Sequence, residues 1–162
     1  MSTRIRILGI DPGLLNTGWG VIEKDGPRLI HIANGTFKVK PAGTLPDRLA
    51  QIYHLLSGVV GEYKPAEAAV EETFVNVNPS STLKLGQARG VAILTPALHG
   101  VKVFEYSPNL IKKSVVGVGH AKKEQIEMMV GMLLGKPAIH SEHAADSLAI
   151  AICHAHNRLI LQ

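Results

Sequence analysis

The sequence has almost no cysteine and no long hydrophobic run. Cys153 is the only cysteine among 162 residues, which excludes an intrachain disulfide and a cluster of cysteine metal ligands. It lies in an apolar stretch typical of a helix, and we expect a buried thiol. No apolar run reaches the roughly 18 residues that a membrane span needs. Arg4 and Arg6 near the start fall within a predicted strand rather than a signal peptide. These absences predict a cytoplasmic protein without a membrane anchor.

Internal repeats, linkers and low-complexity segments are also missing. We therefore expect a single domain over residues 1–162, with a core from about 4 to 156. Hydrophobic residues make up 46% of the chain and charged residues 19%, which is typical of a globular protein. The 17 Lys and Arg residues exceed the 13 Asp and Glu residues, for a net charge of +4. This excess suits a polyanionic partner without identifying one.

The first part of the chain combines a predicted strand with an acidic residue at its end. Residues 5–8 are apolar, Asp11 follows them, and Pro12-Gly13 favours a turn. A second strand is expected to begin near residues 18–21, so the two strands would form a hairpin. Asp11 could simply start the turn, or it could serve a functional site. In the second case the small residues beside it would let a phosphate or a metal ion approach the backbone closely.

The later elements alternate between helices and strands. The pattern predicts a strand over 28–38 with a bulge near 34–35, a helix capped by Thr44, a strand over 68–72, a helix capped by Ser80 or Ser81, a strand over 101–106, helices over 109–116 and 122–134, and a last helix capped by Ser141. The helix over 83–98 is apolar almost all round and is expected to be well buried. Hairpins followed by helical crossovers predict an α/β fold, with a five-stranded mixed sheet and helices on both faces.

Three acidic residues have unusual positions for surface acids. Asp11 and Glu71 each end a predicted strand, whereas Asp146 lies on the last helix, where His143 shares its face. If the two strands are neighbours, these side chains meet at one edge of the sheet. Close carboxylates resist ionising together, and a divalent cation such as Mg²⁺ or Mn²⁺ would relieve the repulsion. Two such ions can support phosphodiester cleavage. Taken singly, each acid is weak evidence, and Asp146 alone would more often be a salt-bridge partner than a ligand.

Four motifs together resemble one known family. Residues 9–13, 70–74, 112–119 and 143–149 read Gly-Ile-Asp-Pro-Gly, Val-Glu-Glu-Thr-Phe, Lys-Lys-Ser-Val-Val-Gly-Val-Gly and His-Ala-Ala-Asp-Ser-Leu-Ala. In this order and spacing they resemble the RuvC family of bacterial Holliday junction resolvases. The resemblance implies a ribonuclease H-like fold and a homodimer that nicks two opposed strands of a four-way DNA junction in recombination and repair. It also implies partnership with the branch-migration proteins RuvA and RuvB.

The resemblance also assigns site residues. The catalytic and metal-binding positions of the family fall on Asp11, Glu71, His143 and Asp146. The third of these positions is Asp in some members and His in others. Two Mg²⁺ ions per site are implied, and Mn²⁺ is expected to substitute. The resemblance thus predicts a complete, metal-dependent active site in this chain.

Several further residues are predicted to contact DNA. The family's aromatic and basic positions fall on Phe74, Lys112 and Lys123. Phe74, in a polar loop, could stack on an unpaired base for about 1–3 kcal/mol, or it could plug a local core. Lys84 and Arg89 are added as cations for phosphates. The other histidines, His154 and His156 among them, show no ligand spacing with the carboxylates and are interpreted as ordinary.

Three other functions are alternatives to the DNA nuclease. An actin-like ATPase would need a second domain and a second phosphate loop, and the sequence has no Walker A pattern. A nuclease of the same fold acting on RNA should lack the block at 112–119. A junction-binding module without catalysis would not need Asp11, Glu71 and Asp146. The sequence therefore favours the DNA endonuclease.

Overall fold

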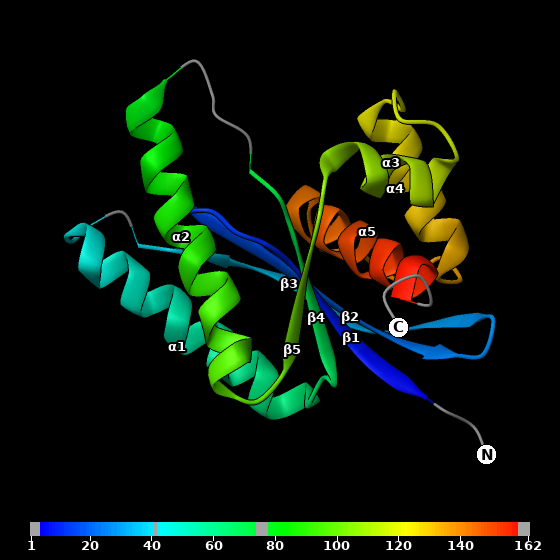
Figure 1. Ribbon diagram of the computed structural model, residues 1–162, viewed down its shortest axis with the longest axis horizontal. Helices are drawn as coiled ribbons and strands as arrows, with labels where there is room; N and C mark the ends of the chain where they lie inside the picture. The colour runs from blue at the N-terminus through cyan, green and yellow to red at the C-terminus, as the bar shows by residue number, and fades with distance from the viewer. Residues whose placement is uncertain (1–3, 41, 74–77, 159–162) are drawn as a thin grey trace.

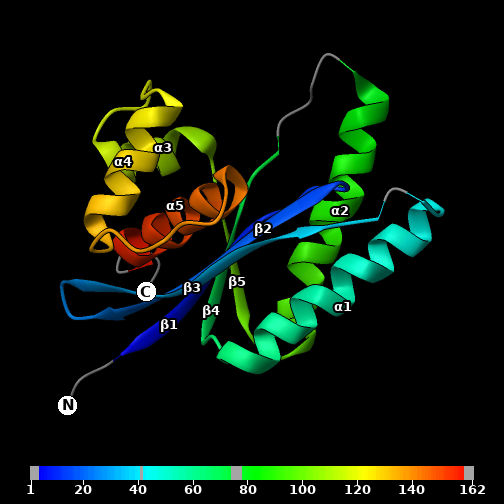
Figure 2. The ribbon, with the colours of Figure 1, turned by 180° about the vertical axis from the view of Figure 1, so that it is seen from behind.

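The computed structural model describes residues 4–40, 42–73 and 78–158, which form one mixed sheet between two layers of helices (Figures 1 and 2). The strands are β1 (Ile5–Asp11), β2 (Asn16–Asp25), β3 (Arg28–Lys38), β4 (Glu67–Glu71) and β5 (Lys102–Tyr106). The helices are α1 (Leu45–Tyr63), α2 (Pro79–Leu98), α3 (Pro108–Val116), α4 (Lys123–Leu133) and α5 (Glu142–Asn157). The predicted five-stranded sheet with helices on both faces is confirmed. Within the described ranges, no helix is long and apolar enough to cross a bilayer.

The strand order is β3-β2-β1-β4-β5. The hairpins β1–β2 and β2–β3 are antiparallel, whereas β4 runs parallel to both β1 and β5. The predicted bulge is misplaced, because the register shift leaves Ile32 without an opposite residue rather than Asn34 or Gly35. Asn34 stays paired in the ladder, opposite Gly20, and its side chain holds a neighbouring loop. It donates to the carbonyl of Ala138 at 2.9 Å and accepts from the amide of His140 at 3.0 Å.

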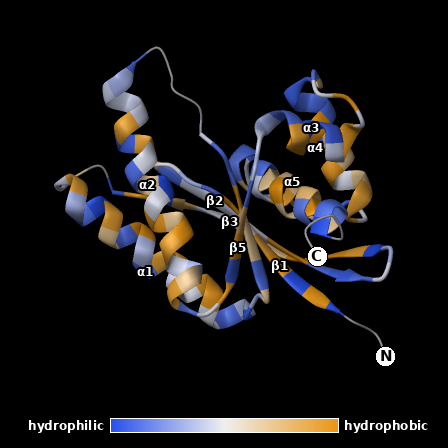
Figure 3. Cartoon of the chain, in the orientation of Figure 1, coloured by the Kyte–Doolittle hydropathy of each residue, from blue (hydrophilic) through white to orange (hydrophobic). Residues whose placement is uncertain are grey.

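Helices α1 and α2 cover one face of the sheet, and α3, α4 and α5 cover the other (Figures 1 and 2). Hydrophobic and hydrophilic residues alternate along α1 (Figure 3), and Ile52 and Leu56 are fully buried on its inner face. The predicted cap is confirmed, since Thr44 accepts a hydrogen bond from the amide of Asp47 in a capping box. Amphipathic packing against the sheet thus fixes this layer.

Helix α2 departs from the prediction in two ways. Its cap is Asn78, which accepts from the amides of Ser80 and Ser81 at 3.1 and 3.3 Å. The helix begins this early because Pro79 suits the first helical position, where a backbone N–H has no partner within the helix. The helix is also not well buried. Its buried positions are mostly small residues, whereas its large side chains face outward. The exposed fractions are 70% for Leu83, 52% for Leu94 and 62% for Leu98.

Helix α5 lies directly on β1 and β2, and glycines make this approach possible. A Cβ atom at Gly9 would lie 1.9 Å from the carbonyl oxygen of Ser147, and one at Gly18 would lie 2.2 Å from that of His143. The expectation that these small residues admit a phosphate or metal ion is therefore wrong for Gly9 and Gly18, because the helix covers them. Their packing role brings the start of α5 over the end of β1.

Candidate active site

Asp11 and Glu71 lie at the same edge of the sheet. Ile10 and Val70 are paired in the parallel register of β1 and β4, and each strand continues by one residue into its carboxylate. The two strands are neighbours, so the condition on which the sequence placed these two acids together is met. The carboxyl ends of parallel strands therefore bring two acids side by side, beside the point where the sheet changes from parallel to antiparallel.

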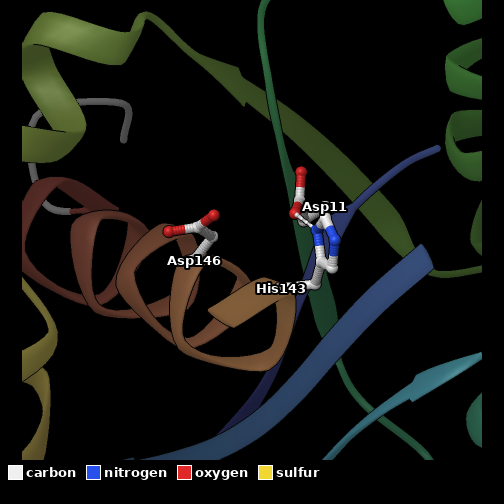
Figure 4. A group of neighbouring side chains, drawn as sticks. All are labelled: Asp11, His143 and Asp146. Atoms are coloured by element: carbon white, nitrogen blue, oxygen red, sulfur yellow. Dashed lines mark hydrogen bonds and ion pairs between the residues drawn. The ribbon is translucent and has the colours of Figure 1, made fainter. Parts of the chain in front are cut away.

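The start of α5 adds two more side chains to this edge. Ser141 caps the helix by accepting from the amide of Ala144 at 3.0 Å, as predicted. His143 and Asp146 then point from successive turns toward Asp11 (Figure 4). One ligand atom from each of these three residues lies within 4.8 Å of the other two, and Nδ1 of His143 is 3.0 Å from Oδ2 of Asp11. The chain thus brings together three of the four predicted ligands as one compact donor group.

Glu71 joins this group through electrostatics. Burial, followed by the nearby charges of Asp11 and Asp146, raises the pKa of Glu71 to about 7, and Lys112 opposes the rise. Burial also raises the pKa values of Asp11 and Asp146, although His143 lowers the first and Lys123 lowers the second. The site therefore resists holding three negative charges without a cation. Hard carboxylate oxygens with one imidazole suit a divalent metal ion, so the donor set fits one.

Two lysines line the side of the site next to α3 and α4. Lys112 and Lys123 share with Glu71 and Asp146 a pocket of about 270 Å³. The ammonium group of Lys123 forms an ion pair with Glu142 and lies 3.9 Å from Oδ2 of Asp146. Both lysines thus place positive charge beside the acids. Their contact with DNA remains a prediction.

The other predicted DNA contacts fall in different environments. Lys84 is exposed on α2 and lines a pocket that also includes His143. Arg89 is turned inward: its Nε donates to the main-chain oxygen of Glu71 at 2.9 Å, and its guanidinium pairs with Glu105. In this position it holds the end of β4. Phe74 lies outside the described residues, so its stacking role also remains a prediction.

Sequence reasoning missed a buried polar cluster at the opposite end of β4. His154 is fully buried, with Nδ1 2.6 Å from the Tyr106 hydroxyl and Nε2 2.6 Å from Oε2 of Glu67. Arg158 donates to both carboxylate oxygens of Glu67, at 2.9 and 3.0 Å. No spacing signal could have revealed it, because β4, β5 and the end of α5 each contribute a residue. The neighbouring Cys153 is buried, as expected.

Comparison with known proteins identifies relatives over almost the whole chain. The family model of crossover junction endodeoxyribonuclease RuvC matches residues 7–154. The RuvC protein of Afipia carboxidovorans is 58% identical over 158 residues, which are 98% of this chain and 92% of that protein. The RuvC protein of Rhodopseudomonas palustris strain TIE-1 is 59% identical over 156 residues, which are 95% of this chain and 88% of that protein.

Solved structures show the same relationship. Thermus thermophilus RuvC in complex with a Holliday junction substrate superposes with a TM-score of 0.88 at 33% identity, covering 96% of each chain. The yeast mitochondrial Holliday junction resolvase Ydc2 superposes with a TM-score of 0.68 at 15% identity, covering 96% of this chain and 79% of that chain, which is a likeness of fold alone. The predicted ribonuclease H-like class is confirmed by these neighbours. With its family model, its relatives and its fold in agreement, the chain belongs to the RuvC family of crossover junction endodeoxyribonucleases.

Proposed function

We propose that this protein resolves four-way Holliday junctions in recombination and repair by nicking two opposed strands. The observation that carries the proposal is the meeting of Asp11, His143 and Asp146 within 4.8 Å at one sheet edge, in a chain of the RuvC family. The related Thermus thermophilus protein was solved with a Holliday junction substrate. A cluster of acids beside lysines suits a polyanion whose phosphate must be hydrolysed.

We propose Mg²⁺ as the metal, with two ions per site and Mn²⁺ as a substitute. Asp11, Glu71, His143 and Asp146 would hold them. When bound, the metal would supply an activated water and stabilise the leaving oxygen of the phosphodiester. The raised pKa values of the three carboxylates support the proposal, because a divalent charge removes the repulsion that opposes their ionisation.

The chain's own cations would position the DNA. Lys112 and Lys123 are proposed to contact phosphates beside the acids. Lys84, which lines a pocket together with His143, is proposed to contact a further phosphate, and Phe74 is proposed to stack on an unpaired base. Arg89 was also predicted to contact DNA, although its present bonds engage Glu71 and Glu105. Lys112 also lowers the pKa of Glu71, so it would help to keep that carboxylate ready for a cation.

A homodimer is also proposed. Two symmetric strands at a junction call for two symmetric active sites, and the outward leucines of α2, Leu83, Leu94 and Leu98, offer an apolar face for such an interface. A monomer mass by light scattering at micromolar concentration would contradict it. Partnership with RuvA and RuvB is proposed from family membership alone.

The decisive experiment offers the protein four labelled substrates with Mg²⁺: a four-way junction, a linear duplex of the same sequence, an RNA hairpin and ATP. We expect paired nicks in opposed strands of the junction, and loss of the nicks when EDTA removes the metal. Equal cleavage of the junction and the duplex would contradict junction resolution. Turnover of the RNA hairpin or of ATP in its place would favour one of the alternative functions.

A further inference from the structure

A second hollow adjoins the site on the side away from α3 and α4. It has a volume of about 470 Å³ and lies between the β1–β2 turn and the helices α1 and α2. Its walls include Leu14 and Leu15 from the turn, Arg48 from α1, and Lys84 and Leu85 from α2, while His143 closes the end next to the active site. We call it the Arg48–Lys84 pocket. Its volume falls within the range of small-molecule binding sites.

This pocket continues into the active site through shared walls. Leu85 also lines a pocket of about 230 Å³ that contains Asp11 and Glu71. Glu71 in turn lines the pocket with Lys112 and Lys123. The three hollows therefore adjoin one another at the ends of β1 and β4, with Asp11 and Glu71 lining the middle hollow, Arg48 and Lys84 lining one outer hollow, and Lys112 and Lys123 lining the other. A nucleic-acid strand whose phosphate lay over the acids would extend into the Arg48–Lys84 pocket.

The lining of this pocket combines positively charged side chains with the apolar side chains of Leu14, Leu15 and Leu85. Among the described residues that line it, the charged side chains are Arg48 and Lys84, and none is acidic. Leu15 is 57% exposed there although it is a large hydrophobic residue. Cations bind phosphates, and apolar side chains suit the faces of a sugar or a base. A nucleotide is the occupant that fits both features together.

We propose that the Arg48–Lys84 pocket binds one nucleotide of the cleaved strand, next to the scissile phosphate. The inference rests on the proposed function and adds Arg48, Leu14 and Leu15 to the DNA-binding surface. The two cations hold the phosphate of that nucleotide, and the leucines contact its base. Binding there fixes the register of the strand, so that the adjacent phosphate lies over Asp11.

The test neutralises one phosphate and one side chain at a time. Junctions carry a single methylphosphonate at successive positions on both sides of the cut, and binding is measured without metal. In the wild-type protein, neutralising the contacted phosphate should weaken binding about tenfold. In Arg48→Ala or Lys84→Ala the same neutralisation should cost less binding than in the wild-type protein, because one of the two cations that hold the phosphate is already gone.

Two controls sharpen the test. Arg28→Ala removes an exposed cation in the β2–β3 turn, at the far end of the sheet from Asp11, and should leave the profile unchanged. Leu15→Ser should weaken binding to an intact nucleotide but not to an abasic one at that position. Thermal melts show whether each variant is folded, and Lys84→Ala is the safer variant because its side chain is exposed.

The outcomes separate the two proposals. The pocket assignment alone would be overturned if the wild-type protein binds and cuts junctions, but each methylphosphonate weakens binding by the same factor in the wild-type protein, in Arg48→Ala and in Lys84→Ala. A wild-type protein that neither binds nor cuts a junction would overturn the proposed function, and the nucleotide site with it.

Discussion

Nδ1 of His143 lies 3.0 Å from Oδ2 of Asp11, which joins the start of α5 to the end of β1. An ionised carboxylate only accepts hydrogen bonds, so when Asp11 is ionised the N–H at Nδ1 of His143 donates the hydrogen bond to Oδ2 of Asp11. In the neutral imidazole, this tautomer leaves the lone pair of Nε2 for a metal ion or for a proton from water. The geometry makes His143 a candidate working member of the site, not only a neighbour of Asp146.

The first prediction follows from this geometry. His143→Asp should keep junction cleavage, because a carboxylate can replace the nitrogen as ligand or base, whereas His143→Ala should lose it. Single-turnover cleavage of a four-way junction by the two variants and the wild-type protein measures this. An Ala variant that cuts as fast as the wild-type protein would show that His143 takes no part in the reaction.

The second prediction concerns Asp11. Asp11→Asn should leave the fold and junction binding intact but raise the barrier to cleavage by several kcal/mol, which corresponds to at least about a 100-fold loss of rate. The reason is the loss of one negative ligand from the compact donor group. Glu72→Gln is the matched control, because Glu72 is adjacent to Glu71 but exposed. Cleavage by Asp11→Asn within tenfold of the wild-type rate would contradict the assignment.

The active site also shows how much of the structure could be predicted from the sequence alone. Periodicity and strand-end acids were enough to predict a mixed five-stranded sheet, because that feature follows from local pattern and crossover rules. The meeting of Asp11 and Glu71 was predicted only on the condition that their strands are neighbours. The close contact of α5 with Gly9 and Gly18 was not predictable, since Gly18 reads locally as no more than the start of a strand. The exposure of Leu83 and the burial of His154 were missed for a related reason. The burial of a side chain depends on which distant helices and strands pack against it, and the local hydrophobic pattern does not contain that information.

The third prediction tests the glycine contact under the site. Gly18→Ala would place a Cβ atom 2.2 Å from the carbonyl of His143, so the start of α5 must move away from β2. We expect cleavage to fall by tenfold or more, since displacements of about 1 Å are that costly in active sites, together with a lower melting temperature. Gly58→Ala is the control: nothing lies near its Cβ position on α1, and it should add about 0.5–1 kcal/mol of stability. Wild-type activity in Gly18→Ala would refute the packing argument.

The fourth prediction concerns stability in acid. The hydrogen bonds from Arg158, the largest cause, lower the pKa of Glu67 to about 2, and burial lowers the pKa of His154. Both groups bind fewer protons in the folded chain than in the unfolded one, so both stabilise the fold less as pH falls. The contribution of His154 should be lost as pH falls through about 6.5, its unfolded range. That of Glu67 should be lost between its unfolded value of 4.5 and about 2.

Chemical denaturation at a series of pH values measures both losses. Glu67→Gln should flatten the curve in the lower range, because the amide does not titrate. Glu62→Gln, which neutralises an exposed acid on α1, serves as the control and should leave the slope unchanged. If the two variants show the same pH dependence, the buried cluster of Glu67, His154 and Arg158 does not govern acid stability.

The fifth prediction is that metal binding releases protons near neutral pH. Burial, together with Asp11 and Asp146, raises the pKa of Glu71 to about 7, so Glu71 carries a proton in part of the molecules near neutral pH before metal arrives. A cation binds the ionised form, which means that the proton must leave and that metal affinity must fall as pH falls through 7. Titration calorimetry with Mg²⁺, in buffers of different ionisation enthalpy, counts the protons released.

Two variants locate the source of those protons. Glu71→Gln should remove most of the release at pH 7. Lys112→Ala should increase it, because Lys112 is the group that lowers the pKa of Glu71, and its loss leaves more of that carboxyl protonated before binding. Lys113→Ala removes the neighbouring exposed lysine and should match the wild-type protein. Equal proton release from the wild type and Glu71→Gln would mean that Glu71 does not change its protonation when the metal binds, and would remove it from the set of coupled ligands.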